Sequence, residues 1–274
     1  MKKYAKILAL LTALTLLVSA CAFAEGSKLE EIQQRGKLIM ATDAVWPPFE
    51  YIGAKGEATG ADVEIAKYIA EQLGVELEVL NVSFDSLTTY LVNGEADVVL
   101  AAMTITEERA ETVDFSVPYT VSEQYIIVPE EDEATATLED LAGKAVGVHL
   151  GTTGDFIVSD EVNLPGGALE GTGASVVQYK SLPDATLAMK NGELGAIVCD
   201  MQLAENLVAV NTGIKCFPMV YADGSKTDEY YGIAMQKGDE AFVEKINQII
   251  EPLVEDGTID GWIVEHTELA AQID

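Results

Sequence analysis

Apolar strands alternate with amphipathic helices through most of the chain, and this order constrains the fold more than any other feature of the sequence. Leu38–Thr42 and Asp97–Met103 are apolar runs typical of strands covered on both faces. Between them, Asp62–Leu73 repeats apolar residues at helical spacing and stops at Gly74. The alternation predicts an α/β fold with largely parallel sheets.

The other expected elements follow the same plan. In the first half they are the strand Val75–Val79 and the helix Phe84–Asn93. In the second half they are the strands Ala145–Leu150, Val176–Lys180, Ala196–Cys199 and Gly232–Gln236, and the helices Asp184–Asn191, Glu240–Asp256 and Gly261–His266.

Two segments of the chain can be laid over each other with an offset of 98 residues. Leu91–Val99 and Met189–Ile197 each contain a helix end, an Asn-Gly stop, a glutamate and the start of a buried strand. A shared Asn-Gly-Glu could arise by chance, but the matching order of elements favours two similar α/β lobes.

Residues 1–24 have the composition of a signal peptide, because three lysines precede an apolar run, Ile7–Ala20, that is too short to span a bilayer. Two processing routes remain open. Ala22-Phe23-Ala24 fits cleavage before Glu25, whereas Val18-Ser19-Ala20-Cys21 resembles a bacterial lipobox in which Cys21 is lipidated. Either route predicts export, to the periplasm or to a lipid anchor on the outer face of the cytoplasmic membrane.

The chain is strongly acidic: 274 residues contain 46 Asp and Glu but only 16 Lys and Arg, for a formal charge of −30. Nucleic acids and anionic membrane surfaces require clustered basic residues, so we expect neither as a partner. The length fits one large or two ordinary domains, and we expect a monomer.

Catalytic motifs are missing from the sequence. It contains no Walker loop, no H-E-x-x-H and no G-x-S-x-G, and its only histidines are His149 and His266. We therefore expect a binding protein with no catalytic residue, no cofactor and no metal site. Cys199 and Cys216 either form a disulfide, which an exported chain permits, or are two buried residues on separate strands.

Several motifs, taken in order, resemble the bacterial extracellular solute-binding proteins that deliver polar amino acids to ABC importers. The resemblance covers about residues 28–265. The matching segments are Thr42-Asp43, Trp46-Pro47-Pro48-Phe49-Glu50, Gly60-Ala61-Asp62-Val63-Glu64-Ile65-Ala66, Thr104-Ile105-Thr106-Glu107-Glu108-Arg109, Asp114-Phe115-Ser116, Pro118-Tyr119, Gly147-Val148-His149-Leu150-Gly151-Thr152-Thr153 and Tyr231-Gly232-Ile233-Ala234-Met235.

The resemblance implies a periplasmic-binding-protein-like fold of type II, with two α/β lobes and a ligand cleft between them. Lobe 1 would comprise residues 25–120 and 222–274, and lobe 2 residues 121–221. The chain would cross between the lobes near Thr120–Ser122 and Met219–Asp223. Ligands of open α/β sheets bind beyond the carboxyl ends of strands, which is where Ala101–Thr104, Gly151–Thr153 and Asp200 lie in the expected order.

The charged groups of the expected site follow from the same resemblance. Arg109 would hold the carboxylate of an amino acid with two parallel hydrogen bonds, helped by the backbone N–H groups of Thr104 and Thr153. Asp200, with the Ala102 carbonyl and the Thr104 hydroxyl, would hold the ammonium. Without the resemblance, Arg109 would be read as an exposed residue among glutamates, and Asp200 as a helix N-cap.

The ligand's side chain would lie between Trp46 and Phe84, residues that composition alone would assign to the core. Gly151 and Thr152 border the second-lobe part of the site, and Asp43 and His149 stand where relatives often touch the distal end of the ligand. We expect a polar or basic L-amino acid, delivered to an ABC-type permease. The alternatives are a periplasmic dehydratase on the same scaffold and a sensory module for a membrane receptor.

Overall fold

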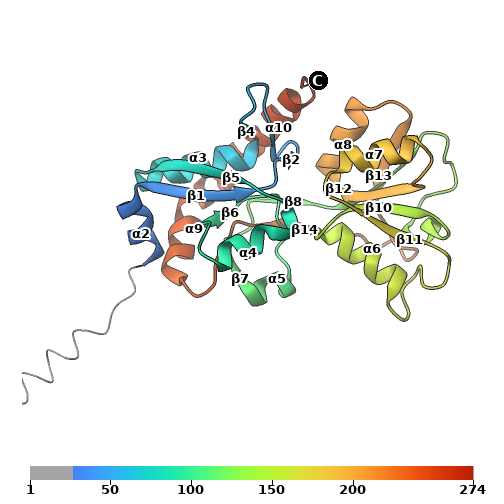
Figure 1. Cartoon of the computed structure of the whole chain (residues 1–274), viewed down its shortest axis with the longest axis horizontal. Coiled ribbons are helices and arrows are strands. Elements are labelled where there is room, and N and C mark those ends of the chain that lie inside the picture. Colours follow the sequence, from blue (N-terminus) through green and yellow to red (C-terminus); the bar gives the residue numbers. More distant parts are fainter. Residues whose placement is uncertain (1–26, 274) are drawn as a thin grey trace, which may run out of the picture.

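Two five-stranded sheets, each sandwiched between helices, form the body of the protein in this computed structural model, which describes residues 27–273 (Figure 1). The proposed signal segment, with Cys21 and both processing sites, lies outside the described residues. The α/β class predicted from the alternating pattern and the two lobes predicted from the 98-residue repeat are confirmed, but each sheet is mixed, with two parallel and two antiparallel strand pairs.

The lobe 1 sheet has the strand order β5-β1-β6-β15-β7, in which β1 is parallel to β5 and β6, and β15 is antiparallel to β6 and β7. Alternate residues of β1 face opposite sides: Met40 packs with α3 and α9, and Ala41 packs with α4. The strands are β1 (Lys37–Thr42), β5 (Glu76–Asn81), β6 (Val98–Val99), β7 (Val113–Phe115) and β15 (Ala234–Gln236).

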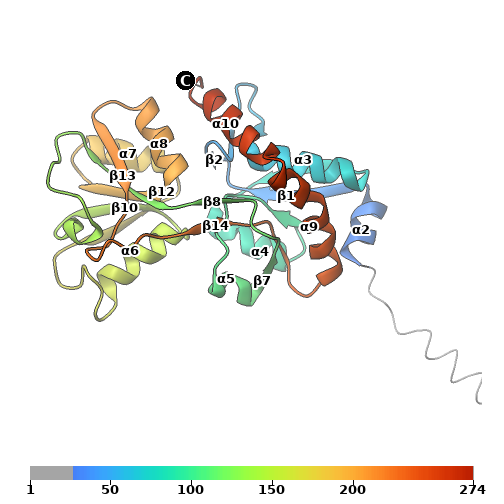
Figure 2. The ribbon, with the colours of Figure 1, turned by 180° about the vertical axis from the view of Figure 1, so that it is seen from behind.

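Six α-helices and a small sheet complete this lobe in the described chain. The helices are α2 (Lys28–Arg35), α3 (Ala61–Leu73), α4 (Leu87–Val92), α5 (Glu107–Thr112), α9 (Glu240–Glu255) and α10 (Thr258–Ala270). The small sheet consists of β2 (Val45–Trp46), β3 (Glu50–Ile52) and β4 (Ala58–Thr59). Seen from behind, α9 and α10 lie across lobe 1 (Figure 2).

The lobe 2 sheet has the order β11-β10-β12-β9-β13, with α6 on one face and α7 and α8 on the other. Its strands are β9 (Gln124–Pro129), β10 (Ala145–His149), β11 (Ser175–Tyr179), β12 (Ala196–Asp200) and β13 (Ile214–Pro218). Its helices are the single-turn η3 (Leu138–Leu141) and α6 (Thr153–Asn163), α7 (Leu182–Lys190) and α8 (Met201–Val210).

The 98-residue repeat is a structural repeat. Gly94 and Gly192 both end their helices with positive φ, 71° and 80°. The following glutamates donate backbone N–H groups to Tyr90 and Ala188, so that both turns close in the same way. Each turn then leads into a strand with a parallel neighbour in its sheet: β6 is parallel to β1, and β12 is parallel to β10.

Two strands connect the lobes and run side by side in both views (Figures 1 and 2). β8 (Thr120–Ser122) pairs antiparallel with β14 (Glu229–Tyr231). The expected return crossing at Met219–Asp223 is wrong, because Met219 donates its N–H to the carbonyl of Gln124 on β9, and Ala222 donates to Glu139, both in lobe 2. The chain therefore returns at β14, so the boundary of lobe 2 expected at residue 221 moves to about 228.

Local corrections fall mainly at the strand ends that approach the other lobe. The strand expected over Asp97–Met103 pairs only at Val98–Val99, and the chain then leaves the sheet with Ala102 at φ 46°. The helix expected over Phe84–Asn93 begins as a 3-10 turn, η2 (Phe84–Ser86), before α4. Cys199 and Cys216 are free and lie on β12 and β13, on either side of β9, which favours the reading without a disulfide.

Candidate functional site

A small cavity of about 10 Å³ lies between the lobes, at the carboxyl ends of β6, β10 and β12. Of the residues predicted for the site, eight line it directly: Trp46, Phe84, Ala102, Thr104, Arg109, Thr152, Thr153 and Asp200, joined by Ala101. The other three, Asp43, His149 and Gly151, contact these residues. The fold thus brings together residues from both lobes that are up to 157 positions apart.

Arg109 comes from α5, whose N-cap Thr106 accepts the Arg109 N–H. Its guanidinium donates to the carbonyl of Thr104 at 2.7 Å and to that of Gly151 in lobe 2 at 3.1 Å. It also lies 5.4 Å from the ring centre of Phe84 and 6.0 Å from that of Phe156. Burial lowers the pKa of Arg109, and the nearby Asp200 and Glu229 carboxyl groups oppose that shift. Arg109 is thus a half-buried cation that lines the cavity and has more donors than these two hydrogen bonds use, unlike a solvated surface arginine.

Asp200 occupies the N-cap position of α8, but its side chain caps no N–H of that helix. The carboxyl group instead accepts hydrogen bonds from Gln124 Nε2 and from the hydroxyl of Tyr231. Burial and the charge of Glu229 raise the pKa of Asp200 to about 7. The carboxyl group therefore lies on the lobe 2 wall of the cavity, opposite Arg109 on the lobe 1 wall.

Aromatic rings meet at the other end of the site. His149 stacks on Trp46 with ring centres 5.3 Å apart and is tilted against Phe84 at 6.0 Å. Asp43 accepts the Phe84 N–H at 2.9 Å, and its Oδ2 lies 3.5 Å from His149 Nε2. Burial raises the pKa of Asp43 to about 6 and lowers the pKa of His149 to about 4. At neutral pH the imidazole is uncharged and Asp43 is the charged group of this end.

The lobe 2 loop before α6, residues 150–152, completes the lobe 2 wall of the cavity. Thr152 caps α6 by accepting the Asp155 N–H, and Asp155 in turn accepts the N–H of Gly151 at 2.9 Å. Gly151 has φ 83°, a left-handed conformation that glycine adopts without strain. The loop therefore presents the carbonyl of Gly151 to Arg109 and the first residue of α6, Thr153, to the cavity.

Sequence reasoning missed Glu229, which is 3% exposed and lies on the connecting strand β14. Its Oε2 accepts the hydroxyl of Thr104 at 2.7 Å and that of Thr153 at 2.9 Å, so one carboxylate oxygen joins both lobes. Gln124 and Tyr231, which hold Asp200, were also missed as site residues. Only the Tyr231-Gly232 motif marked this region, and Glu229 itself stands in a polar segment with the composition of a surface loop.

Residues 38–265 match the bacterial extracellular solute-binding proteins, family 3. The chain belongs to this family. It is 32% identical over 261 residues to a probable histidine-binding protein of Neisseria gonorrhoeae, covering 95% of this chain and 93% of that protein.

Solved structures with the same fold include the amino acid ABC transporter substrate-binding protein AbpA of Streptococcus pneumoniae bound to L-arginine. It is 29% identical with a TM-score of 0.81, and the match covers 89% of this chain and 100% of that one. The ancestral amino acid-binding protein AncCDT-1, a precursor of cyclohexadienyl dehydratase, is 30% identical with a TM-score of 0.77, covering 88% and 100%. The expected type II binding-protein fold is confirmed.

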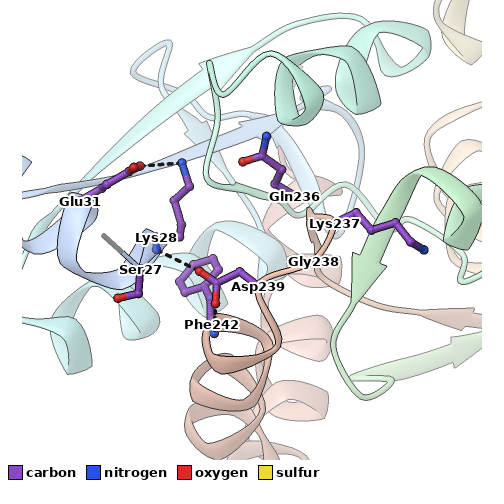
Figure 3. A pocket seen from close by; sticks show the side chains of 8 residues that line it. All are labelled: Ser27, Lys28, Glu31, Gln236, Lys237, Gly238, Asp239 and Phe242. Carbon is purple, nitrogen blue, oxygen red and sulfur yellow. Dashed lines mark hydrogen bonds and ion pairs between the residues drawn. The ribbon is translucent and has the colours of Figure 1, made fainter. Parts of the chain in front are cut away.

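A larger cavity of this family-3 protein, about 670 Å³, lies elsewhere in lobe 1, between α2 and the start of α9 (Figure 3). Its charges already have partners: the Lys28 ammonium donates to Glu31, and Asp239 accepts the backbone N–H groups of Lys28 and Phe242. None of the predicted site residues lines it. Over residues 27–273, no helix combines the length and apolar character needed to cross a membrane, and no group of three or more His, Cys, Asp or Glu is placed to hold a metal.

Proposed function

We propose that the protein binds a polar or basic L-amino acid between its lobes outside the cytoplasm and delivers it to an ABC-type permease. The observation that carries this function is the placement of a half-buried cation, Arg109, and a buried acid, Asp200, on opposite walls of one cavity. An α-amino acid has a carboxylate and an ammonium on one carbon, and it complements such a pair.

In the bound state, Arg109 and the backbone N–H groups of Thr104 and Thr153 receive the carboxylate. Asp200 and the carbonyl of Ala102 receive the ammonium. The ligand's side chain extends toward Trp46, Phe84 and the Asp43 carboxylate. Relatives named for histidine and arginine binding support a polar or basic ligand.

Ligand binding favours closure because its two ends draw on different lobes. The ligand shifts the equilibrium between open and closed lobes toward the closed state. The size of the shift is the difference between the ligand's binding free energies for the two states. The permease would recognise the closed form. A sensory role would use the same closure and differ only in the membrane partner.

A thermal-shift screen of the twenty amino acids against the chain from residue 25 onward tests the function. Polar or basic L-amino acids should raise the melting temperature, since a ligand that binds only the folded form stabilises it. Failure of every amino acid would contradict the proposal. Turnover of a cyclic carboxylic acid in the same samples would instead favour the dehydratase alternative.

The protein is proposed to be exported, as a periplasmic chain beginning at Glu25 or as a lipoprotein anchored through Cys21, and to act as a monomer. Mass spectrometry of the exported protein distinguishes the two processing routes by the mass of the N-terminal peptide. Light scattering of the purified chain measures its oligomeric state.

A further inference from the structure

Ala102 has an unusual backbone for its residue type. Its φ is 46°, and among residues 27–273 it is the only residue other than glycine with a positive φ. A left-handed backbone is strained in an L-residue with a side chain, because Cβ comes too close to the following carbonyl oxygen. Ala102 is also buried and lines the interlobe cavity, so some interaction has to hold the strained conformation in the site.

Asp62 is the group that holds it. Its Oδ2 accepts the Ala102 N–H at 2.8 Å and the Tyr119 hydroxyl at 3.0 Å. The Asp62 side chain is fully buried in the first turn of α3 and does not line the cavity. A charged acceptor strengthens both hydrogen bonds, because charge-assisted bonds are roughly twice as strong as neutral ones.

A second carboxyl group supports Asp62 from behind. Glu50, on β3, is 1% exposed and forms a hydrogen bond with Asp62. Burial and the neighbouring charge of Asp62 raise the pKa of Glu50 well above its usual range, while the pKa of Asp62 rises only to about 6. Glu50 is therefore the member of the pair that holds a proton more tightly, and a proton on Glu50 leaves the pair with one negative charge.

The start of α3, which carries Asp62, is fixed by hydrogen bonds and close contacts to the segment that precedes Glu50. Asp62 donates its own N–H to the carbonyl of Phe49, and Ala61 donates to that of Pro48. A Cβ at Gly60 would lie 2.0 Å from the Phe49 carbonyl oxygen. The start of α3 is thus fixed against the strand that contains Glu50.

We propose that Asp62 is a positioning residue for ligand binding: its carboxylate, held by Glu50 and Tyr119, keeps Ala102 left-handed so that the Ala102 carbonyl faces the ligand's ammonium. This inference rests on the proposed function. Asp62 does not contact the ligand and acts only through the backbone of Ala102.

Calorimetry with arginine, and with histidine as a second probe, tests the role. Asp62→Ala should weaken the affinity at least tenfold. Asp62→Asn should stay within about threefold of the wild type, because its amide oxygen can accept both hydrogen bonds. Adding Ala102→Gly to Asp62→Ala should recover a large part of the loss, since glycine adopts positive φ without the strain.

Asp97→Ala is the matched control. Asp97 is also buried in lobe 1, at 1% exposure, and accepts a backbone N–H, that of Ile39, at 2.8 Å. Its loss should lower the melting temperature but leave the affinity of the folded protein unchanged. If Asp62→Ala does not fold, Asp62→Ser, too short to reach Ala102, takes its place with the same rescue.

The outcomes separate the two proposals. A wild-type protein that binds no amino acid overturns the proposed function and this role with it. A wild type that binds, with Asp62→Ala at unchanged affinity, overturns the positioning role alone. A loss of affinity in Asp62→Ala that Ala102→Gly does not recover also overturns the positioning role. Asp62 would then act on general stability, as Asp97 does.

Discussion

The guanidinium of Arg109 in lobe 1 donates to the carbonyl of Gly151 in lobe 2 at 3.1 Å. The same group bonds its own lobe through the Thr104 carbonyl, so it is part of the contact that closes the cleft. Under the proposed function, a residue placed in this way serves both ligand recognition and closure.

Arg109→Ala should weaken amino-acid binding by a few kcal/mol, since hydrogen bonds to charged groups contribute about 1.5–3 kcal/mol each. Arg109→Lys should recover only part, because an ammonium cannot form the two parallel bonds of a guanidinium. Calorimetry of both variants checks this. Unchanged affinity in Arg109→Ala would remove this residue from the site.

The raised pKa of Asp200 predicts that the affinity for an amino acid rises with pH. Its pKa is raised to about 7 before the ligand binds, so below that pH the carboxyl group must lose a proton to pair with an ammonium. With arginine as the probe, affinity should increase from pH 5.5 to 8, by at most tenfold per pH unit, and level off above about 7. Titrations in buffers of different ionisation enthalpy should show proton release.

The variant that checks this assignment is Asp200→Asn, which should bind more weakly and lose the slope near pH 7. Asp43→Asn is the control, because Asp43 also has a raised pKa, about 6, but does not line the cavity. The slope near pH 7 should persist in this control. A slope retained in Asp200→Asn would assign the proton to another group.

Glu229→Gln should shift the pH midpoint of binding to lower values. The Glu229 charge is one cause of the raised pKa of Asp200, and the amide removes that charge while keeping an oxygen for the Thr104 and Thr153 hydroxyls. Glu229→Ala removes that oxygen too, and should reduce the compaction that ligand causes in small-angle X-ray scattering. Equal compaction in Glu229→Ala and wild type would argue against a role in closure.

Gly60→Ala should destabilise the protein by about 3 kcal/mol, because its Cβ would lie 2.0 Å from the Phe49 carbonyl oxygen and its φ is 132°. Gly56→Ala is the control: it also has positive φ, 84°, but its Cβ would meet nothing within 4 Å. That variant should lose only about 1 kcal/mol. Denaturant unfolding compares the two, and equal losses would contradict the steric explanation.

Local sequence patterns predicted much of the fold. The helix Asp62–Leu73 and the strand Leu38–Thr42 were predicted to within one residue, because their periodicity and the glycine at the helix end are local signals. The repeat around Gly94 and Gly192 likewise predicted two lobes. Patterns could not predict where the chain returns to lobe 1, since the pairing of β14 with β8 joins segments more than 100 residues apart.

The family resemblance that the ordered motifs carry implied which residues the candidate site would contain, Arg109 and Asp200 among them. Only the tertiary structure decided what surrounds them. Glu229 became an interlobe acceptor when β14 was buried, and Ala102 took a left-handed backbone beside a carboxylate 40 positions away. Burial and charge proximity depend on all the neighbouring elements together, so they exist only once the chain is folded.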